Sequence, residues 1–487
     1  MGVTIPSAAG EVKEVYEEIS NSLRFNDDDS AYLAKTPSGA GNRNTWTFST
    51  WVKKCMPVTG GNQRLIACGS GTGIKFSTIE FDSSDRIRIL EGTESGSATT
   101  VVNGVGNNRD PSAWYHVVVK YDSTQGTAAD RVEIYLNGVE VTYSSTTYPA
   151  QNYDSEFNNT VVHNIGATSV GGSVASFLDG YMTEVHLVDG AAKAPTDFGE
   201  FDDNGVWIPK RYTGTYGTNG FFMQFKQTGT SQNSSGIGAD TSGNDNHFAV
   251  TNLAATDVTE DTCTNNFCTL SPLAQNTYAG GTLSEGNCEW TSGVSEYSPR
   301  LGTFGLSSGK WYWEIKPTLN EGSSNDPFLI GISSTEATAN SQELGHSSDD
   351  WAYYNNGKYR NSDSDSNYGD TYTVNDIIGV ALDLDNSKLY FSKNGTFQNS
   401  GDPTSGSTGT GAISITSNLA ATNFGFYFPA LSDYDNSSGK YSRFQANFGN
   451  PPFAISSGNT DGKYGNFEYA VPSGYYAICT KRLAEFG

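Results

Sequence analysis

Short runs in which apolar and polar side chains alternate, separated by turn residues, constrain the fold of this chain more than any other feature. An alternation with a period of two is typical of a β-strand that has one face in a core. Glycine supplies 55 of the 487 residues, and each interior glycine costs a helix about 1 kcal/mol. The sequence therefore predicts an all-β protein without long helices. The clearest runs are 22–25, 45–54, 113–122 and 130–141.

Charge excludes one large class of partner. The chain has 29 basic and 53 acidic residues and a formal net charge of −24. Because nucleic acids are bound through clusters of Lys and Arg, we expect no nucleic-acid partner. We also expect no membrane partner, since no apolar run reaches the roughly 18 residues of a membrane span. The acidic first twenty residues argue against a cleaved secretory peptide.

One helical pattern is present, at the N-terminus. Val12, Tyr16 and Ile19 recur at helical spacing within 11–20, with four Glu around them. A helix of about three turns is too short to trimerise by itself in water. Two interpretations stay open for residues 1–20: a helix that packs on its own domain, or an anchor onto a larger assembly.

A β-hairpin is predicted within 130–141. Asn137-Gly138 suits a two-residue type I′ turn, which places Leu136 opposite Val139 and Ile134 opposite Val141. The six cysteines do not form the framework of a small secreted domain. Cys55 and Cys68 permit a disulfide across a hairpin with Gly60-Gly61 at its tip, or two reduced thiols.

Residues 21–190 carry an ordered set of motifs. In this order they resemble a laminin G-like, concanavalin A-type jelly roll, which implies an antiparallel two-sheet sandwich. Residues 191–282 are too aromatic for a free linker, so we expect extra strands that pack between or onto the domains. The motifs are SLRFNDDDSAYL, TWTFSTWVKK, WYHVVVKYD, the Asn-Gly hairpin and LDGYMTEVHLVDG.

Residues 283–487 resemble a SPRY domain, a bent two-sheet sandwich. The resemblance rests on a strand that ends in Asp383 and Asp385, followed by a hairpin on Asn394-Gly395. The alternation places Ile378, Val380, Leu382 and Leu384 on one apolar face, and Ile377, Gly379, Ala381 and Asp383 on the other. We predict a final strand at 474–483. The other motifs are SGKWYWEIK, FLIGISS, WAYYNNGKYR and FQANFGNPPF.

The order of the two domains, with the joining motifs between them, resembles structural proteins of tailed bacteriophages, especially marine ones. This resemblance implies a virion component such as a tail fibre, spike or capsid-surface fibre, made in the host cytoplasm. It implies that the N-terminal anchor binds other virion proteins and that the chain binds a host-surface glycan or receptor. It also implies a homo-oligomer, and by analogy with other fibre proteins we expect a trimer. The joining motifs are FGEF, VWIPK, YGTNGF and TNNFCTL.

The first domain contains three acidic residues that could belong to a catalytic site. Glu80, Asp82 and Asp85 are spaced like the acids of a glycoside hydrolase, which needs two carboxyls about 5–5.5 Å apart in retaining enzymes. An ordinary hairpin with a turn at Ser83-Ser84-Asp85 explains the same residues better. We therefore expect a protein that is not an enzyme and holds no cofactor.

Residues 361–370 partly resemble a calcium-binding loop. Asp363, Asp365 and Asn367 alternate like the start of an EF-hand, but Gly369 falls one place late and Val374 stands where the EF-hand has Glu. A solvated polar loop is the default interpretation, and whether an ion binds there stays open.

Sugar recognition is the chemistry that the composition favours, because aromatic faces stack on sugar rings while charged side chains bind hydroxyls. One stretch of the SPRY-like part is rich in both. The alternative is that its Trp and one Tyr face belong to the core. The candidate ligand-binding residues are Asp349, Asp350, Trp351, Tyr353, Tyr354, Lys358 and Arg360.

Three functions compete at this stage. The first is a non-enzymatic virion protein that binds host-surface glycans. The second is an architectural protein that decorates the capsid or fibre without binding the host. The third is a glycan-cleaving enzyme that uses Glu80 and Asp82.

Overall fold

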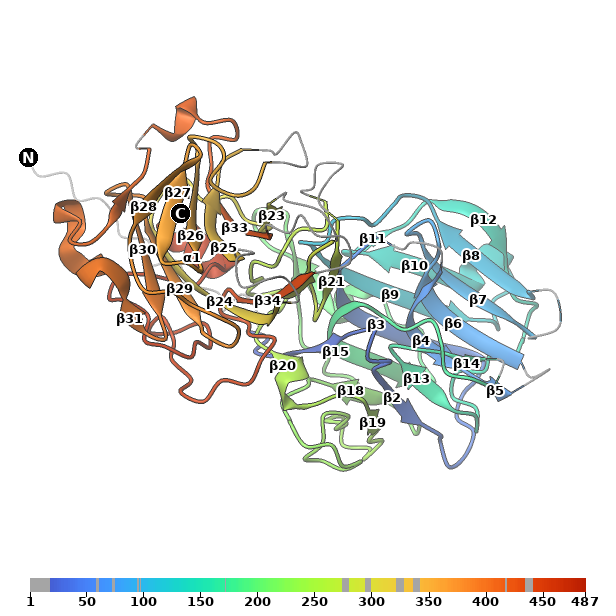
Figure 1. Ribbon diagram of the computed structural model, residues 1–487. Helices are drawn as coiled ribbons and strands as arrows, with labels where there is room; N and C mark the ends of the chain where they lie inside the picture. The colour runs from blue at the N-terminus through green and yellow to red at the C-terminus, as the bar shows by residue number, and fades with distance from the viewer. Residues whose placement is uncertain are drawn as a thin grey trace, which may run out of the picture.

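The chain folds into two β-sandwiches that lie side by side (Figure 1). The computed structural model describes residues 18–487 except 58–60, 72–74, 94–95, 97, 171, 274–279, 294–298, 321–327, 336–341, 417 and 434–440. Both sandwiches are built from antiparallel sheets, which confirms the predicted all-β fold. The helix predicted at the N-terminus falls almost wholly in residues 1–17, outside the described residues, and stays a prediction.

The first sandwich has two eight-stranded sheets. One sheet contains β1 (Ser22–Phe25), β3 (Thr45–Lys54), β9 (Trp114–Asp122), β10 (Val132–Leu136), β11 (Val139–Glu140), β15 (Gly180–Asp189), β18 (Phe221–Met223) and β20 (Val258–Thr259). The other contains β2 (Tyr32–Lys35), β4 (Gln63–Cys68), β6 (Lys75–Phe81), β7 (Ile87–Thr93), β8 (Thr100–Gly104), β12 (Tyr143–Thr147), β13 (His163–Ile165) and β19 (Ala249–Thr251).

The order of the strands shows where the joining segment goes. The sheets run β11-β10-β9-β3-β15-β1-β20, with β18 on β15, and β12-β8-β7-β6-β4-β13-β2-β19. Strands β18, β19 and β20 come from residues 191–282, so this segment extends both sheets of the first sandwich. Two small sheets complete the unit: β5 (Ser70–Gly71) with β14 (Ser169–Val170), and β16 (Gly199–Phe201) with β17 (Trp207–Pro209).

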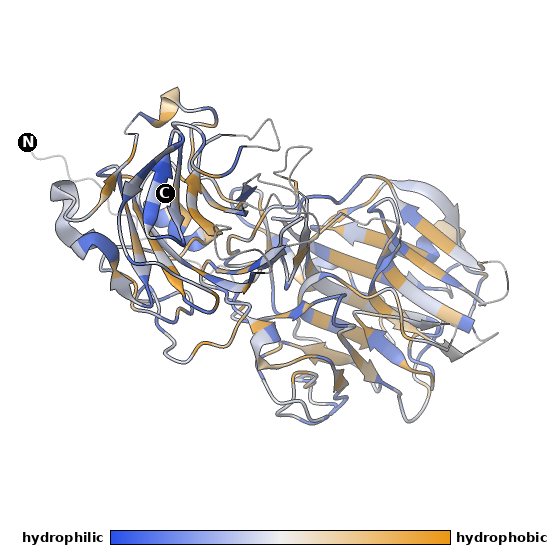
Figure 2. Cartoon of the chain, viewed as in Figure 1, coloured by the Kyte–Doolittle hydropathy of each residue, from blue (hydrophilic) through white to orange (hydrophobic). Residues whose placement is uncertain are grey.

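The core of the first sandwich lies between its sheets. Figure 2 shows apolar and polar residues alternating along these strands, as the period of two requires. Trp46 on β3 is fully buried and stacks on Tyr121 of β9, with 4.7 Å between ring centroids. Aromatic pairs of this kind add about 0.5–1.5 kcal/mol to the burial of the rings themselves.

The predicted hairpin is confirmed. Leu136 pairs with Val139, and the amide of Val141 donates to the carbonyl oxygen of Ile134. Asn137 and Gly138 have φ values of 47° and 78°, as a type I′ turn requires. This turn touches the neighbouring β17, because a Cβ on Gly138 would lie 2.3 Å from the ring of Trp207.

We expect Gly138→Ala to lower the free energy of unfolding by about 2–4 kcal/mol, because it adds a clash to the strain of a positive φ. Gly205 is the matched control: its φ of 79° is almost the same as the 78° of Gly138, but its Cβ position is open. Gly205→Ala should cost only about 1–2 kcal/mol. Urea unfolding measures both variants, and equal losses would contradict the clash.

The disulfide that Cys55 and Cys68 permitted does not form. Both are free, buried thiols, and burial raises the pKa of each well above its ordinary value. The hairpin proposed between them is also wrong, because β3 and β4 belong to opposite sheets. The chain between these strands crosses from one sheet to the other instead of turning back on itself.

The second sandwich has sheets of eight and six strands. The larger contains β21 (Thr282–Ser284), β22 (Glu289–Thr291), β24 (Lys310–Asn320), β29 (Ile378–Asp383), β30 (Lys388–Lys393), β31 (Thr396–Phe397), β32 (Ile413–Ser414) and β34 (Ser442–Asn447). The smaller contains β23 (Arg300–Leu301), β25 (Phe328–Ser333), β26 (Asp350–Tyr354), β27 (Lys358–Asn361), β28 (Ser364–Asn367) and β33 (Phe428–Asp433). Their orders are β21-β22-β34-β24-β29-β30-β31, with β32 on β30, and β23-β33-β25-β26-β27-β28.

Strand β29 alternates as predicted, but both of its faces are covered. Ile378, Val380 and Leu382 lie in the core between the sheets. Ala381 faces a second apolar cluster on the outside of the sheet, which the C-terminal segment supplies through residues such as Phe467. A sheet buried on both faces needs apolar residues at every position, which explains the continuous apolar run of β29.

The predicted strand at 474–483 is wrong. Tyr476 and Cys479 make only isolated bridges, and the chain then forms α1 (Thr480–Phe486). Phe486 stacks on Tyr476 with 3.8 Å between ring centroids, so the helix folds back over the segment before it. Among the described residues, no helix is both long and apolar enough to cross a membrane. Short 3₁₀ helices are Ala128–Arg131, Pro195–Asp197, Ala255–Asp257, Gln398–Ser400, Pro403–Thr408 and Leu419–Ala421.

A buried arginine joins the two sandwiches. The side chain of Arg24 on β1 is 1 % exposed and lies within 3.4 Å of Asp257 and 3.0 Å of Glu285. Its guanidinium also donates to the carbonyl oxygens of Thr256 and Pro451. Since these partners come from the joining segment and from the second sandwich, Arg24 ties the two units together.

Candidate functional site

The aromatic residues predicted to bind sugar lie on β26, where both faces are buried. Trp351 and Tyr353 point into the core between the sheets, with 5 % and 0 % of their surface exposed. Tyr354 points the other way, into an apolar cluster with Ala352 and Leu344. Stacking of a sugar on Tyr353 or Tyr354 is therefore wrong as a prediction, since neither ring face is open.

The charged candidates are largely occupied. Asp350 is buried and accepts a hydrogen bond from Ser333 Oγ at 2.7 Å. Burial raises the pKa of Asp350 to about 7. Asp349, next to it, is partly exposed. The set predicted from sequence thus forms mainly structural contacts.

The two basic candidates lie on β27 and already have acidic partners. Arg360 contacts Asp363 at 2.7 Å and Glu343 at 3.1 Å, while Lys358 lies 3.8 Å from Asp365. Asp363 sits in the turn between β27 and β28, and its carboxylate accepts a hydrogen bond from Arg360. Among the described residues, no group of three or more His, Cys, Asp or Glu has the arrangement of a metal site.

A groove opens beside the predicted segment, and Trp351 is among the residues that line it. Its volume is about 540 Å³, and its walls carry mainly hydroxyl groups. We call it the hydroxyl groove. It is lined by Ser348, Trp351, Tyr359, Asn361, Ser364, Ser366, Ser414, Ile415 and Thr416.

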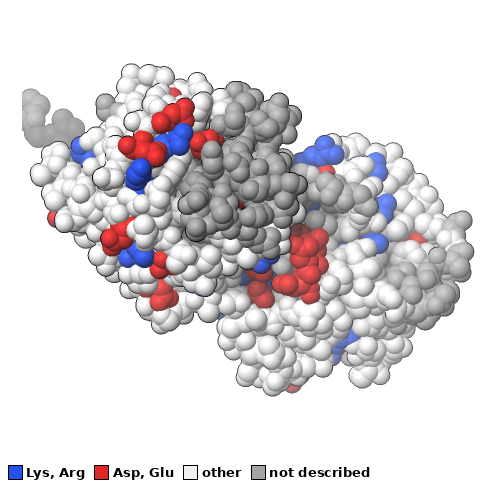
Figure 3. All heavy atoms as spheres, in the orientation of Figure 1, with Lys and Arg blue, Asp and Glu red and all other residues white. Residues whose placement is uncertain are grey.

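A second pocket lies in the first sandwich, at its junction with β21. Its volume is about 470 Å³, which accommodates one or two sugar rings. Figure 3 shows acidic side chains gathered where the two sandwiches meet on this face. We call this pocket the acidic pocket. It is lined by Asp27, Asp28, Met56, Pro57, Gly61, Asn62, Gln63, Ser176, Phe177, Asp179, Gly281, Thr282 and Leu283.

Asp179 is the unusual member of the acidic pocket. It is 4 % exposed, and its Oδ1 atom has no hydrogen-bond partner in the described part of the chain. Burial, together with the nearby Asp27, Asp28 and Glu285, raises the pKa of Asp179 well above its ordinary value. An unpartnered buried polar atom costs about 1–3 kcal/mol. A ligand hydroxyl that reached this oxygen would remove that cost.

Sequence reasoning did not find the acidic pocket. Asp27 lies in the loop after β1, Asn62 in the loop before β4 and Asp179 in the loop before β15. Asp27 and Asp179 fall within motifs that indicate the fold of the domain, but those motifs do not indicate a binding role. Only the closure of the sandwich brings these loops together.

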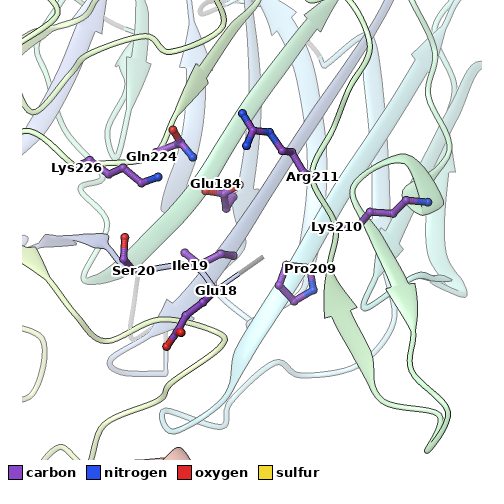
Figure 4. A pocket seen from close by; sticks show the side chains of 9 residues that line it. All are labelled: Glu18, Ile19, Ser20, Glu184, Pro209, Lys210, Arg211, Gln224 and Lys226. Carbon is purple, nitrogen blue, oxygen red and sulfur yellow. The ribbon is translucent and has the colours of Figure 1, made fainter. Parts of the chain in front are cut away.

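A third pocket lies where the chain enters the first sandwich (Figure 4). Its volume is about 20 Å³, room for little more than one water molecule. It is therefore too small for a sugar. It is lined by Glu18, Ile19, Ser20, Glu184, Pro209, Lys210, Arg211, Gln224 and Lys226.

The acids that resembled a hydrolase site each have a basic partner. Glu80 binds Arg64 and Arg88 in an ion pair on the face of the sheet. Asp82 closes the turn between β6 and β7 and binds Arg86 at 2.6 Å. The turn predicted at Ser83-Ser84-Asp85 is confirmed by these contacts.

The last acid of that set, Asp85, binds Lys54 and also lies 2.7 Å from Arg109 Nε. The residue has a positive φ of 60°, which suits the turn. Three carboxylates that each neutralise their own cations stabilise this hairpin.

Comparison with known families identifies both sandwiches. Residues 26–196 match the concanavalin A-like lectin/glucanases superfamily, and residues 310–420 match the SPRY domain. The chain therefore contains a laminin G-like, concanavalin A-like lectin domain and a SPRY domain, as the motifs indicated. The acidic pocket lies mainly in the first of these domains.

Individual relatives cover only parts of the chain. The ATP-dependent RNA helicase DDX1 of Xenopus laevis is 32 % identical over 112 residues, which are 23 % of this chain and 14 % of the helicase. The SPRY domain of human HERC1 is 17 % identical, with a TM-score of 0.24, and covers 32 % of this chain and 86 % of its own. A putative carbohydrate-binding protein from Bacteroides ovatus is 14 % identical, with a TM-score of 0.33, and covers 48 % and 58 %.

Proposed function

We propose that this chain is a non-enzymatic, glycan-binding protein and that the acidic pocket of its concanavalin A-like domain holds the sugar. The family match to lectins and glucanases supports binding of carbohydrate by this domain. The observation that carries the proposal is Asp179, a buried carboxyl whose Oδ1 atom lacks a partner and which lines a pocket of sugar size.

The composition of the pocket favours a particular class of glycan. Phe177 is half-buried and offers an aromatic surface to the C–H groups of a sugar ring. Asn62 and Gln63 carry amides that both donate and accept hydrogen bonds. Asp27 and Asp28 repel anions, so we propose a neutral or amino sugar and not a sulfated or sialylated one.

We further propose that the protein is a structural component of a tailed-phage virion, in a tail fibre, spike or capsid-surface fibre. The order of the two domains and the motifs between them supports this setting. In it, residues 1–20 attach the chain to other virion proteins, and the chain forms a homo-oligomer such as a trimer. Several copies would raise a roughly millimolar affinity per site through avidity.

A glycan array tests the binding site, with the protein displayed in many copies. We expect neutral or amino sugars to bind, and Phe177→Ala to weaken that binding about tenfold, since an aromatic contact contributes about 1–1.5 kcal/mol. Asp179→Ala should weaken it about tenfold to a hundredfold. Asp130→Ala is the control, because Asp130 is exposed on a distant 3₁₀ helix. Unchanged binding in both pocket variants would contradict the site.

An adsorption assay tests the virion role separately. Purified protein at saturating concentration should reduce attachment of the phage to its host, and the Asp179→Ala protein should not. If attachment is unchanged while the glycan array is positive, the role in host attachment is contradicted and the binding site stands. If both are negative, an architectural protein without host binding is the better hypothesis.

A further inference from the structure

Three side chains with complementary chemistry meet in the buried junction between the two sandwiches. The ammonium of Lys53, on β3, has 1 % of its side chain exposed. Its Nζ atom lies 2.8 Å from Asp261 Oδ2 and 2.7 Å from Asn266 Oδ1. An amine, a carboxamide and a carboxylate are thus in direct contact.

Buried groups surround Lys53 and Asp261 and fix the geometry of the cluster. Asp261 is fully buried, and its Oδ1 atom accepts hydrogen bonds from Trp114 Nε1 at 3.2 Å and from the amide of Phe267 at 3.3 Å. The ring of Tyr181 lies 5.5 Å from the ammonium of Lys53. Water therefore has little access to Lys53 and Asp261, whereas Asn266 is partly exposed.

The orientation of Asn266 places its carbonyl carbon in reach of the amine. Its Oδ1 atom accepts from Lys53, and its Nδ2 atom donates to the carbonyl oxygen of Ser112. Both ends of the carboxamide are held, so the amide plane is fixed against Nζ. Groups held in such contact react as if present at effective concentrations of about 10⁵ M or more.

We propose that Lys53 and Asn266 form an intramolecular isopeptide bond, with Asp261 as the catalytic residue. Asp261 takes a proton from the ammonium of Lys53, and the neutral amine attacks Cγ of Asn266. Asp261 returns the proton to Nδ2 as the bond between Cγ and Nδ2 breaks, and the departing ammonia takes the second proton from Nζ and leaves as ammonium. The new bond between Nζ and Cγ remains as a neutral amide, and no oxidant or reductant is needed.

The bond would join the two halves of the molecule. Lys53 belongs to the first sandwich, whereas Asn266 is followed by Phe267, which packs with Tyr312 in the outer apolar cluster of the second. The two residues are 213 positions apart in the chain, so one bond would close most of the first domain into a loop. Such a cross-link would hold the acidic pocket, which lies at the same junction, in one arrangement.

The neighbouring Lys54 provides a matched control. It is also buried against a carboxylate, that of Asp85, but Arg109 binds the same group. A carboxylate that is held as an anion between two cations is a poor electrophile, so no bond is expected there. The comparison separates amide chemistry at Lys53 from simple burial of a lysine.

Intact-mass measurement of the denatured full chain tests the proposal. We expect a mass below that of the sequence by one ammonia molecule. Lys53→Arg, Asn266→Ala and Asp261→Ala should each show the unaltered mass of their sequence, and Lys54→Arg should keep the loss. A wild-type chain at the full mass of its sequence would overturn the proposal, whether or not any variant folds.

Peptide mapping identifies the bond itself. Trypsin should release residues 44–54 joined to residues 227–300, because it does not cleave after a modified Lys53. A cyclic imide at another asparagine also loses ammonia but leaves these peptides separate. An ammonia loss without joined peptides would therefore contradict the proposal as firmly as no loss.

Discussion

Replacing Arg24 with Ala is expected to lower the free energy of unfolding by about 3–5 kcal/mol, the range found when one partner of a buried ion pair is removed. The substitution would leave Asp257 and Glu285 at the junction without their cation. It would also leave the carbonyl oxygens of Thr256 and Pro451 without a donor. No other side chain contacts all four of these groups in the described structure.

Arg443→Ala is the control for this prediction. Arg443 also pairs with a glutamate, Glu289, at 3.5 Å, but its side chain is 41 % exposed. An exposed pair contributes only about 0–1 kcal/mol. In urea unfolding, the free energies of unfolding of the two variants should therefore differ by several kcal/mol. Equal losses would show that the buried contacts of Arg24 do not join the two sandwiches.

Calorimetry adds a readout that stability alone does not provide. If Arg24 couples the two sandwiches, its loss should split one thermal transition into two, because each sandwich has its own core. A single transition that merely shifts to lower temperature would contradict the coupling. The proposed bond between Lys53 and Asn266 lies at the same junction, so the measurement is best made in chains with and without Asn266→Ala.

Local sequence patterns predicted the strands because turn geometry and side-chain alternation depend only on neighbouring residues. The turn at Asn137-Gly138 sets the register of its hairpin without help from the rest of the chain. The alternation on β29 likewise gives the two faces of that strand. A side-chain period of two depends only on backbone geometry, so it is legible in the sequence.

Contacts between distant segments could not be predicted in this way. The ring of Tyr354 looks available in a sequence rich in polar residues, but it lies in an apolar cluster with Leu301 and Ala430 from other strands of the second sandwich. Cys55 and Cys68 look like hairpin partners until the chain between them crosses to the other sheet. In both cases the outcome depends on tertiary packing that no local pattern encodes.

The candidate site illustrates the same limit. Asp179 follows a turn in the chain, and its chemistry depends on burial and on Asp27 and Asp28, about 150 positions away. The domain that contains it was predictable from motif order, and the domain match confirms it. The pocket within the domain was not, because loops from three strand ends form it together.

Acidification should destabilise the first sandwich through His116. This residue is 1 % exposed, and burial lowers its pKa to about 3. Trp207 Nε1 donates to His116 Nδ1 at 2.9 Å, and Ser49 Oγ lies 2.9 Å from Nε2. Since the indole N–H can only donate, Nδ1 must be unprotonated, and protonation of the ring would break this bond.

The direction of the pH effect follows from the pKa of His116, which is about 3 in the folded chain and has its ordinary value of about 6.5 in the unfolded chain. Between about pH 6.5 and pH 3 the unfolded chain binds a proton at this histidine and the folded chain does not, so stability falls as the pH falls. Between pH 7 and pH 4.5, His116 alone should lower the free energy of unfolding by about 2–3 kcal/mol. Burial also lowers the pKa of His163, to about 4, which acts in the same direction.

The substitution of His116 separates its contribution to the pH dependence of stability from that of the carboxylates. His116→Gln should be less stable than the wild type at pH 7, because it loses packing against Trp51 at a centroid distance of 4.8 Å. The difference between the two proteins should shrink by about 2–3 kcal/mol at pH 4.5, where only the wild type gains a proton at position 116 on unfolding. A difference that stayed constant between the two pH values would mean that His116 is charged in the folded chain, which the bond from Trp207 forbids.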